Sequence, residues 1–138
     1  MERNFLIDVY KKEIRCSLEY AVPVWHSSLT KKNSDDIERV QKAACAIILG
    51  DSFETYRKSC SVLNLEDLKT RREKMCIKFA KKEAKNSNSL FKEIHKPYQT
   101  RNNHKFEEIY CRTKTFQQSS LPYLTKVLNE NVQFFTLC

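Results

Sequence analysis

A run of basic side chains in residues 69–85 (KTRREKMCIKFAKKEAK) is the part of the sequence best suited to bind another molecule. The run holds eight basic residues and two acidic ones, in a chain whose formal net charge is +8. Several of the bases recur at steps of three and four residues, which places them on one face of a helix. A cationic stripe of this kind can bind the phosphates of a nucleic-acid backbone. The predicted nucleic-acid-binding residues are Arg71, Arg72, Lys74, Lys78, Lys81, Lys82 and Lys85.

The same run also fits a plain solvated helix face. Glu73 and Glu83 can pair with lysines one turn away, and such pairs are common on exposed helices. However, eight bases against two acids leave most of the positive charge uncompensated, and like charges one turn apart cost roughly a few tenths of a kcal/mol each. We therefore favour an anionic partner. Further bases and aromatic residues either extend this surface by stacking on nucleobases or are buried in the protein: Arg101, Lys105, Arg112 and Lys114, with Phe106, Tyr110 and Phe116.

No other group of residues predicts catalysis, a metal site or a bound cofactor. The adjacent Asp35 and Asp36 are interpreted as charges that favour the first turn of a helix, because neighbouring helical positions diverge by about 100° and do not converge on one ion. His26 has no acidic partner at a fixed spacing, so a catalytic triad is not expected. The six cysteines form no C-x-x-C pair and are interpreted as reduced thiols.

Composition predicts an all-α fold. The 138 residues include one glycine and three prolines, so tight hairpin turns and glycine-rich phosphate loops are not expected. A hydrophobic content of 41% is typical of a chain with a folded core. The N-terminus lacks the apolar segment of a signal peptide, and no apolar run is long enough to span a membrane. We therefore expect an intracellular protein, nuclear or cytoplasmic, with no membrane partner.

Apolar periodicity predicts a small bundle of about four helices. The first covers residues 3–20, with an apolar face of Leu6, Tyr10, Ile14 and Leu18. The second begins at a cap on Asn33 or Ser34 and ends at Gly50. Its predicted buried stripe consists of Ile37, Val40, Ala44, Ile47 and Ile48. A short helix over 55–63 follows, and the basic helix runs from 66 or 67 to 85.

A shift in composition at Asn86 divides the chain into two predicted parts. Residues 1–85 form the helical domain, and residues 86–138 form a polar linker and a less ordered C-terminal arm that ends in a short helix. The first helix begins almost at Met1 without a capping residue, which suggests a longer parent with neighbours upstream. In their absence, the apolar face of this helix is available to a protein partner.

Four blocks of sequence occur in this order: IRCSLEYAVPVWHSSLT, DIERVQKAACAIILG, LNLEDLKTRREKMCIKFAKK and CRTKTFQQSSLPYLTKVLN. In order and spacing they resemble the C-terminal part of jockey-like non-LTR retrotransposon reverse transcriptases, over residues from about Phe5 to Asn129. The resemblance implies that residues 1–85 correspond to the thumb and the helices behind the polymerase palm. In such polymerases the thumb is helical and grips the template–primer duplex by its backbone. The resemblance also places Arg71 and Arg72 at an arginine pair of the third block.

The sequence departs from that family in ways that bear on activity. The palm with its aromatic-x-Asp-Asp turn is absent, and Asp35-Asp36 does not correspond to it. Ala44-Cys45-Ala46 stands where the family often has an arginine. The resemblance therefore implies a truncated remnant that is not an enzyme, although its parent would be an RNA-directed DNA polymerase. It would bind a duplex or RNA–DNA hybrid backbone weakly and without sequence preference. A helical protein-interaction module and a fragment without function are the alternatives.

Overall fold

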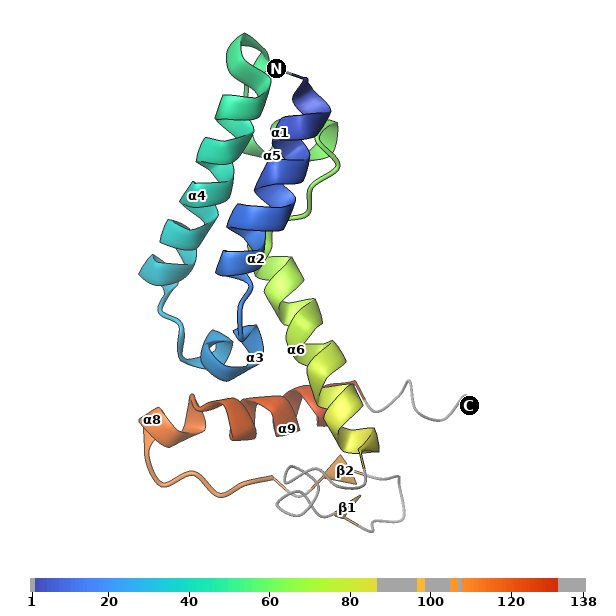
Figure 1. Ribbon diagram of the computed structural model, residues 1–138. Coiled ribbons are helices and arrows are strands. Elements are labelled where there is room, and N and C mark those ends of the chain that lie inside the picture. Colours follow the sequence, from blue (N-terminus) through green and yellow to red (C-terminus); the bar gives the residue numbers. More distant parts are fainter. Residues whose placement is uncertain (1, 87–96, 99–104, 107, 132–138) are drawn as a thin grey trace. The chain divides into compact units, whose positions relative to one another are not determined.

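The computed structural model describes residues 2–86, 97–98, 105–106 and 108–131, and the chain divides into two compact units. Unit 1 consists of Met1–Ala21 and Leu29–Arg72, and unit 2 consists of Val22–Ser28 and Glu73–Cys138. The described residues are mainly helical (Figure 1), which confirms the predicted all-α class. The units do not divide at residue 85, because the basic helix contributes its first residues to unit 1 and the rest to unit 2.

The first helix of unit 1 changes its hydrogen-bond pattern along its length. It comprises α1 (Arg3–Val9), the π-helix η1 (Tyr10–Ile14) and α2 (Arg15–Leu18). In a π-helix each backbone N–H bonds five residues back, and the apolar period of the sequence does not predict such a turn. The chain leaves the helix through Ala21, which has a positive φ of 50°. The helix expected over 3–20 is therefore present, with an irregular middle.

The second helix, α4 (Lys31–Leu49), packs against α1 and runs in the opposite direction (Figure 1). The Thr30 hydroxyl caps α4 by accepting a hydrogen bond from the backbone N–H of Asn33 at 3.2 Å. The predicted cap on Asn33 or Ser34 is therefore wrong, and the helix begins earlier. Gly50 follows with a φ of 53°, which favours glycine at this helix end. The remaining elements that contribute to unit 1 are η3 (Gly50–Ser52), α5 (Tyr56–Val62) and the start of α6 (Leu68–Lys85).

The buried face of α4 differs from the predicted stripe. Ala44 and Ile48 are buried as expected, whereas Val40 and Ile47 are exposed. The buried core of unit 1 consists of Tyr10, Ala44, Cys45, Ile48, Leu49, Cys60, Leu63 and Leu65. The predicted and observed buried faces differ because Gln41, a polar residue, lies at the centre of the observed one. Glutamine is ordinarily a surface residue, so an apolar pattern does not include it.

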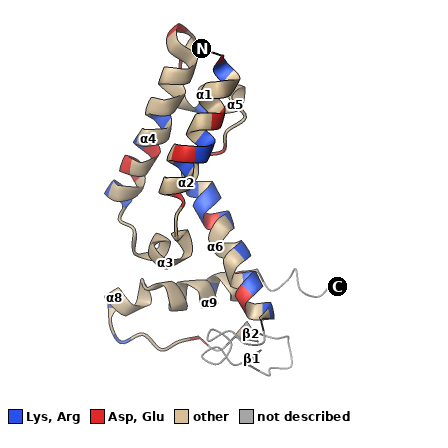
Figure 2. Ribbon diagram, viewed as in Figure 1, with Lys and Arg blue, Asp and Glu red and all other residues tan. Residues whose placement is uncertain are grey.

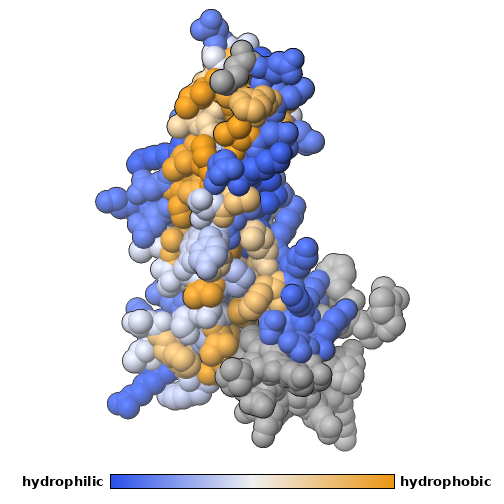
Figure 3. Space-filling model, in the orientation of Figure 1, coloured by the Kyte–Doolittle hydropathy of each residue, from blue (hydrophilic) through white to orange (hydrophobic). Residues whose placement is uncertain are grey.

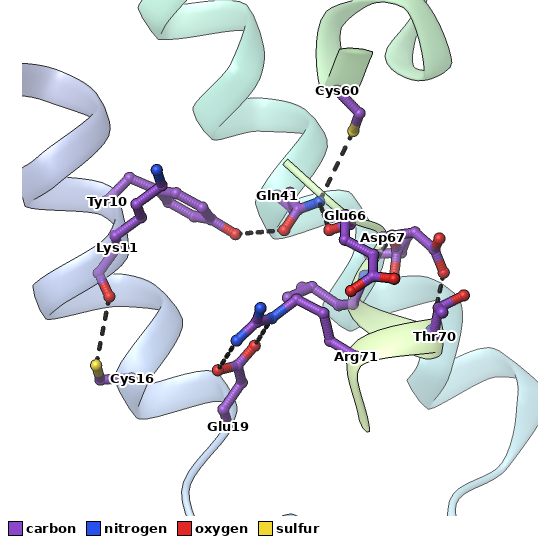
Figure 4. Close-up of polar contacts among 12 residues, drawn as sticks. Tyr10, Lys11, Cys16, Glu19, Gln41, Cys60, Glu66, Asp67, Thr70 and Arg71 are labelled. Carbon is purple, nitrogen blue, oxygen red and sulfur yellow. Dashed lines mark hydrogen bonds and ion pairs between the residues drawn. The ribbon is translucent and has the colours of Figure 1, made fainter. Parts of the chain in front are cut away.

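Gln41 is 0% exposed, and its side chain joins α4 to three other segments of unit 1 (Figure 4). Its Oε1 accepts a hydrogen bond from the Tyr10 hydroxyl at 2.7 Å. Its Nε2 donates to the Tyr56 hydroxyl oxygen at 2.9 Å and to the backbone carbonyl of Glu66 at 3.0 Å. Burial raises the pKa of both tyrosines, so both hydroxyls keep their protons at neutral pH. The amide of Gln41 is thus bonded at both ends.

A second set of hydrogen bonds fixes the start of α6 within unit 1. The Tyr56 hydroxyl donates to Glu38 Oε1, and the same oxygen accepts the backbone N–H of Leu68 at 3.1 Å. Asp67 Oδ2 accepts the backbone N–H of Thr70 at 2.9 Å and so caps the helix. Burial alone would raise the pKa of Asp67, but the hydrogen bonds from Thr70 outweigh it and hold the pKa below its ordinary value.

Unit 2 packs helices from three parts of the chain around a small apolar core. Its helical elements are α3 (Val22–Trp25), the 3-10 helix η2 (His26–Ser28), residues 73–85 of α6, α8 (Lys114–Gln117) and α9 (Ser120–Glu130). The buried core consists of Val22, Cys76, Ala80, Leu124 and Leu128. Pro122 lies in the first turn of α9, where the missing N–H removes no helical hydrogen bond.

Part of the predicted C-terminal arm belongs to the packed structure of unit 2. The short strands β1 (Pro97–Tyr98) and β2 (Lys105–Phe106) pair in antiparallel orientation. The side-chain amide of Asn129 accepts the N–H of Phe106 at 2.9 Å and donates to its carbonyl at 3.0 Å. Phe106 also packs against the apolar core. The prediction of a less ordered arm falls partly on residues 87–96, 99–104, 107 and 132–138, which lie outside the described residues.

Replacing Gln41 by leucine should destabilise unit 1 by about 2–4 kcal/mol, because it leaves the Glu66 carbonyl and the Tyr10 hydroxyl buried without their partner. Urea unfolding followed by circular dichroism measures this loss. Lys42→Leu, at the neighbouring exposed position, is the matched control and should change the stability by about 0.5 kcal/mol or less. Equal effects of the two variants would contradict the role given to the Gln41 amide.

Replacing Asp67 by alanine should cost about 1 kcal/mol at neutral pH, because the first turn of α6 loses its cap. The folded-state pKa of Asp67 is lowered, so its contribution is fully present above its ordinary pKa and is lost as the pH falls through the folded value. The difference between wild type and Asp67→Ala should therefore shrink below about pH 4. Unfolding curves at several pH values, with Asp51→Ala as control, test this. A difference that is constant with pH would exclude the carboxylate as the cap.

Candidate nucleic-acid interface

Residues 73–85 of α6 have one buried face and one basic face. Cys76 and Ala80 are fully buried in the core of unit 2. Steps of three and four residues place the lysines on the opposite side, where Lys81 is half-buried and the others are exposed. Figure 2 shows the basic positions along α6 in blue. We define the basic face by Lys74, Lys78, Lys81, Lys82 and Lys85.

The composition of this segment makes the basic face strongly cationic. Residues 73–85 contain five lysines and two acids, Glu73 and Glu83, both half-buried. A lysine ammonium is a compact charge on a flexible stem, so it follows a phosphate backbone without demanding a fixed geometry. Such a face can bind anionic polymers but provides no means of reading base sequence.

Arg71 faces a carboxylate inside unit 1 rather than a ligand (Figure 4). Its Nε lies 2.5 Å from Glu19 Oε1, and its Nη2 lies 3.0 Å from Glu19 Oε2. The two parallel contacts form a bidentate pair, the strongest arrangement available to arginine and carboxylate. The hydrogen bond with Glu19 is the main cause that raises the pKa of Arg71. We infer that Arg71 links α6 to the first helix of unit 1.

Arg72 is buried, at 1% exposure, so the prediction that it contacts a phosphate is wrong. Its Nη2 donates to the Ser34 hydroxyl at 2.7 Å. Its Nε and Nη1 have no hydrogen-bond partner among the described residues. A guanidinium inside the protein cannot reach a nucleic-acid backbone, and the candidate interface therefore loses Arg72.

The second group of bases and aromatics is only partly described. Arg101 lies outside the described residues, and so does the side chain of Lys105. Arg112 and Lys114 are exposed. Of the three aromatics, Phe106 packs on the core of unit 2, whereas Phe116 and especially Tyr110, at 87% exposure, face solvent. Of the two alternatives for these aromatics, packing in the protein therefore applies to Phe106, whereas the ring of Tyr110 is accessible for stacking.

The aspartate pair does not lie where the sequence analysis placed it. Because α4 begins at Lys31, its first turn contains no acidic residue, and the expected interaction with the first turn is wrong. Asp36 instead pairs with Arg39 at 2.7 Å on the exposed side of α4. Within the described residues, no group of three or more His, Cys, Asp or Glu side chains is placed to hold a metal ion.

His26 and the cysteines have packing roles in the described structure. The His26 ring meets the Tyr123 ring edge to face, with centroids 5.6 Å apart and planes at 62°. Cys45, Cys60 and Cys76 are buried thiols outside any disulfide. Burial raises the pKa of Cys45 to about 12, which keeps this thiol protonated and unreactive at neutral pH.

Among the residues that the structure describes, no helix is both long enough and apolar enough to cross a membrane.

An exposed apolar face lies on unit 1, over α1 and α4 (Figure 3). On the first helix it includes Phe5, at 55% exposure, with Val9 one turn later and Ile14 a further five residues on. The five-residue step matches the hydrogen-bond period of η1. Ile47, at 74% exposure, and Val40 contribute from α4. We call these five residues the apolar face.

Sequence reasoning missed the polar network around Gln41 and the pairing of Arg71. The partners of these residues lie between 15 and 52 positions away in sequence, so no local period indicates them. The one available signal was the presence of Glu19, Glu38 and Gln41 at otherwise apolar helix positions. A polar residue on an apolar face indicates a buried partner.

The two arginines should respond differently to replacement by methionine. Arg71→Met should lower the free energy of unfolding by about 1–2 kcal/mol, because it leaves the Glu19 carboxylate without its partner. Arg72→Met should not lower it, since methionine fills the site without burying a charge whose Nε and Nη1 lack partners. Urea unfolding measures both. A loss at Arg72 equal to that at Arg71 would contradict this account.

The described geometry leaves one surface suited to an anionic polymer, the basic face of α6, and one suited to a protein, the apolar face. No protein-family model, curated protein or solved structure matches this chain. Its function is therefore inferred from the geometry of the described residues and from the resemblance of its sequence blocks.

Proposed function

We propose that this chain is a thumb-like helical fragment of a jockey-like non-LTR reverse transcriptase that binds nucleic-acid backbones and carries no catalytic site. The observation that supports binding is the basic face of α6, on which five lysines lie opposite the buried Cys76 and Ala80. The ligand is a duplex or an RNA–DNA hybrid, held by its phosphates and without sequence preference.

Counterion release makes the proposed binding strongly dependent on salt. Each phosphate neutralised by a lysine releases a condensed cation, and this entropy gain drives association. If about four of the five lysines make contacts, log K should fall with log salt with a slope of about −3 to −4 on duplex DNA. Binding is therefore weak at physiological salt and readily measured below it.

The contacts within unit 1 support the proposed relation to the reverse transcriptases. Glu19 belongs to the first of the four resembling blocks and pairs with Arg71 of the third. Gln41 belongs to the second block and bonds the backbone of Glu66 in the third. Three of the four blocks that carry the resemblance are thus joined by polar contacts within unit 1, as expected if these parts of the blocks pack together.

Catalysis is not part of the proposal. The 138 residues contain no aromatic-x-Asp-Asp turn, and Asp36 is engaged with Arg39 on an exposed helix face. A polymerase needs two metal ions held by converging carboxylates. A primer-extension assay in which the purified chain incorporated nucleotides would overturn this part of the proposal.

A protein-interaction module is the second candidate function, and the apolar face favours it. Large exposed apolar residues gathered on two neighbouring helices commonly mark a binding surface. Size-exclusion chromatography of the purified chain, with and without nuclease treatment, separates the two candidates. Association that persists after nuclease treatment and is abolished by Ile47→Lys would favour the interaction module.

Charge reversal on the basic face tests backbone binding directly. Lys78→Glu combined with Lys82→Glu should weaken duplex binding and reduce the magnitude of the salt slope by about 2, since each lysine accounts for about one unit. Filter binding across a salt series measures both quantities. Lys12→Glu combined with Lys42→Glu changes the net charge equally, at exposed positions of unit 1.

The control should leave the slope unchanged if the basic face is the site. Equal effects of the two double variants would mean that only net charge matters. Absence of binding at low salt would exclude the proposed function.

A further inference from the structure

Unit 2 contains a pocket of about 700 Å³ that the basic face does not use. Its walls come from residues 108–111, the end of α8 and the first half of α9, and Ser27 of η2 also lines it. All of these residues belong to unit 2. The volume lies within the range of about 300–1,000 Å³ that is typical of small-ligand sites.

An exposed aromatic ring stands on the wall of this pocket. Tyr110 lines it and is 87% exposed, so packing in the core does not account for this aromatic residue. Tyr123 lines the pocket as well, but its ring is half-buried against His26. A solvent-facing tyrosine beside a cavity offers a flat surface on which a planar ligand can stack.

The polar groups of the pocket suit the edge of a planar, hydrogen-bonding ligand. Gln117 and Gln118 line it, and no hydrogen bond joins either side-chain amide to another described residue. Each amide offers a donor and an acceptor side by side. The Ser27 hydroxyl is also buried without a partner among the described residues. Three side chains therefore keep unused hydrogen-bonding capacity at this site.

The charges of the pocket set the orientation of such a ligand. Lys126 lines the pocket and is exposed, with its Nζ 3.9 Å from Glu130 on the same helix. Glu108, also exposed, would repel a phosphate placed inside. A carboxylate accepts hydrogen bonds from exocyclic amino groups of nucleobases, as amides do from adenine. The combination favours a base inside and its phosphate outside, near the ammonium of Lys126.

We propose that this pocket holds an unpaired nucleobase of single-stranded nucleic acid, stacked on Tyr110 and hydrogen-bonded by Gln117 and Gln118. Paired bases within a duplex present no free face and cannot enter, so the pocket selects single strands or strand ends. The inference rests on the proposed function only for the class of ligand, because none of the pocket residues belongs to the basic face.

The experiment uses the full chain and a single-stranded oligonucleotide that carries 2-aminopurine, whose fluorescence is quenched by stacking on an aromatic ring. Titration of wild type should quench the probe. Tyr110→Ala should abolish the quenching and weaken single-strand affinity about 10-fold or more, and Tyr110→Trp should restore both. The matched control is Tyr20→Ala. Tyr20 is also exposed but lies in unit 1, away from the pocket residues of unit 2, so this variant should behave as wild type.

Duplex binding by the same variants separates this inference from the proposed function. The pocket is supported if Tyr110→Ala leaves duplex affinity unchanged while single-strand affinity falls. It is also supported, with the proposed function refuted, if wild type quenches the probe but does not bind duplex. Failure of wild type to quench, or quenching that survives Tyr110→Ala, overturns it. Equal losses on single strands and duplex overturn it too.

Discussion

The structure of unit 1 depends on the buried side-chain amide of Gln41, whose oxygen and nitrogen both need hydrogen-bond partners inside the protein. Gln41 has no access to water, and a buried amide without hydrogen bonds is strongly unfavourable. Its partners come from three other segments, through the hydroxyls of Tyr10 and Tyr56 and the carbonyl of Glu66. Each of these segments must lie in the observed register for all of these hydrogen bonds to form at once. Apolar contacts alone are less selective, so the polar network specifies how the helices of unit 1 meet.

Polar contacts within unit 1 also join three of the four sequence blocks to one another, although Tyr10 and Tyr56 lie outside these blocks. Glu19, Gln41 and Arg71 each join one block to another. Their role in unit 1 is to hold helices together, and this role requires no catalytic centre.

Local features of the fold were predictable from sequence, and contacts between distant segments were not. Scarce glycine and a regular apolar period were sufficient for the helical class and for most helix limits. The lysines of α6 were placed on one face because that depends only on helical periodicity. The pairings of Arg71 and Arg72 could not be predicted because Glu19 and Ser34 lie 52 and 38 residues away. The cap at Thr30 was missed because several polar residues there can cap equally well.

The basic run of α6 thus contains two arginines that are engaged within unit 1 and five lysines, those of the basic face, that are proposed to bind phosphate. Lysine-reactive labelling followed by mass spectrometry, with and without a duplex at low salt, tests this division most directly. The account predicts that the duplex protects Lys78 and Lys82 while Lys12 and Lys42 stay equally reactive. Uniform protection of all lysines, or protection confined to unit 1, would contradict it.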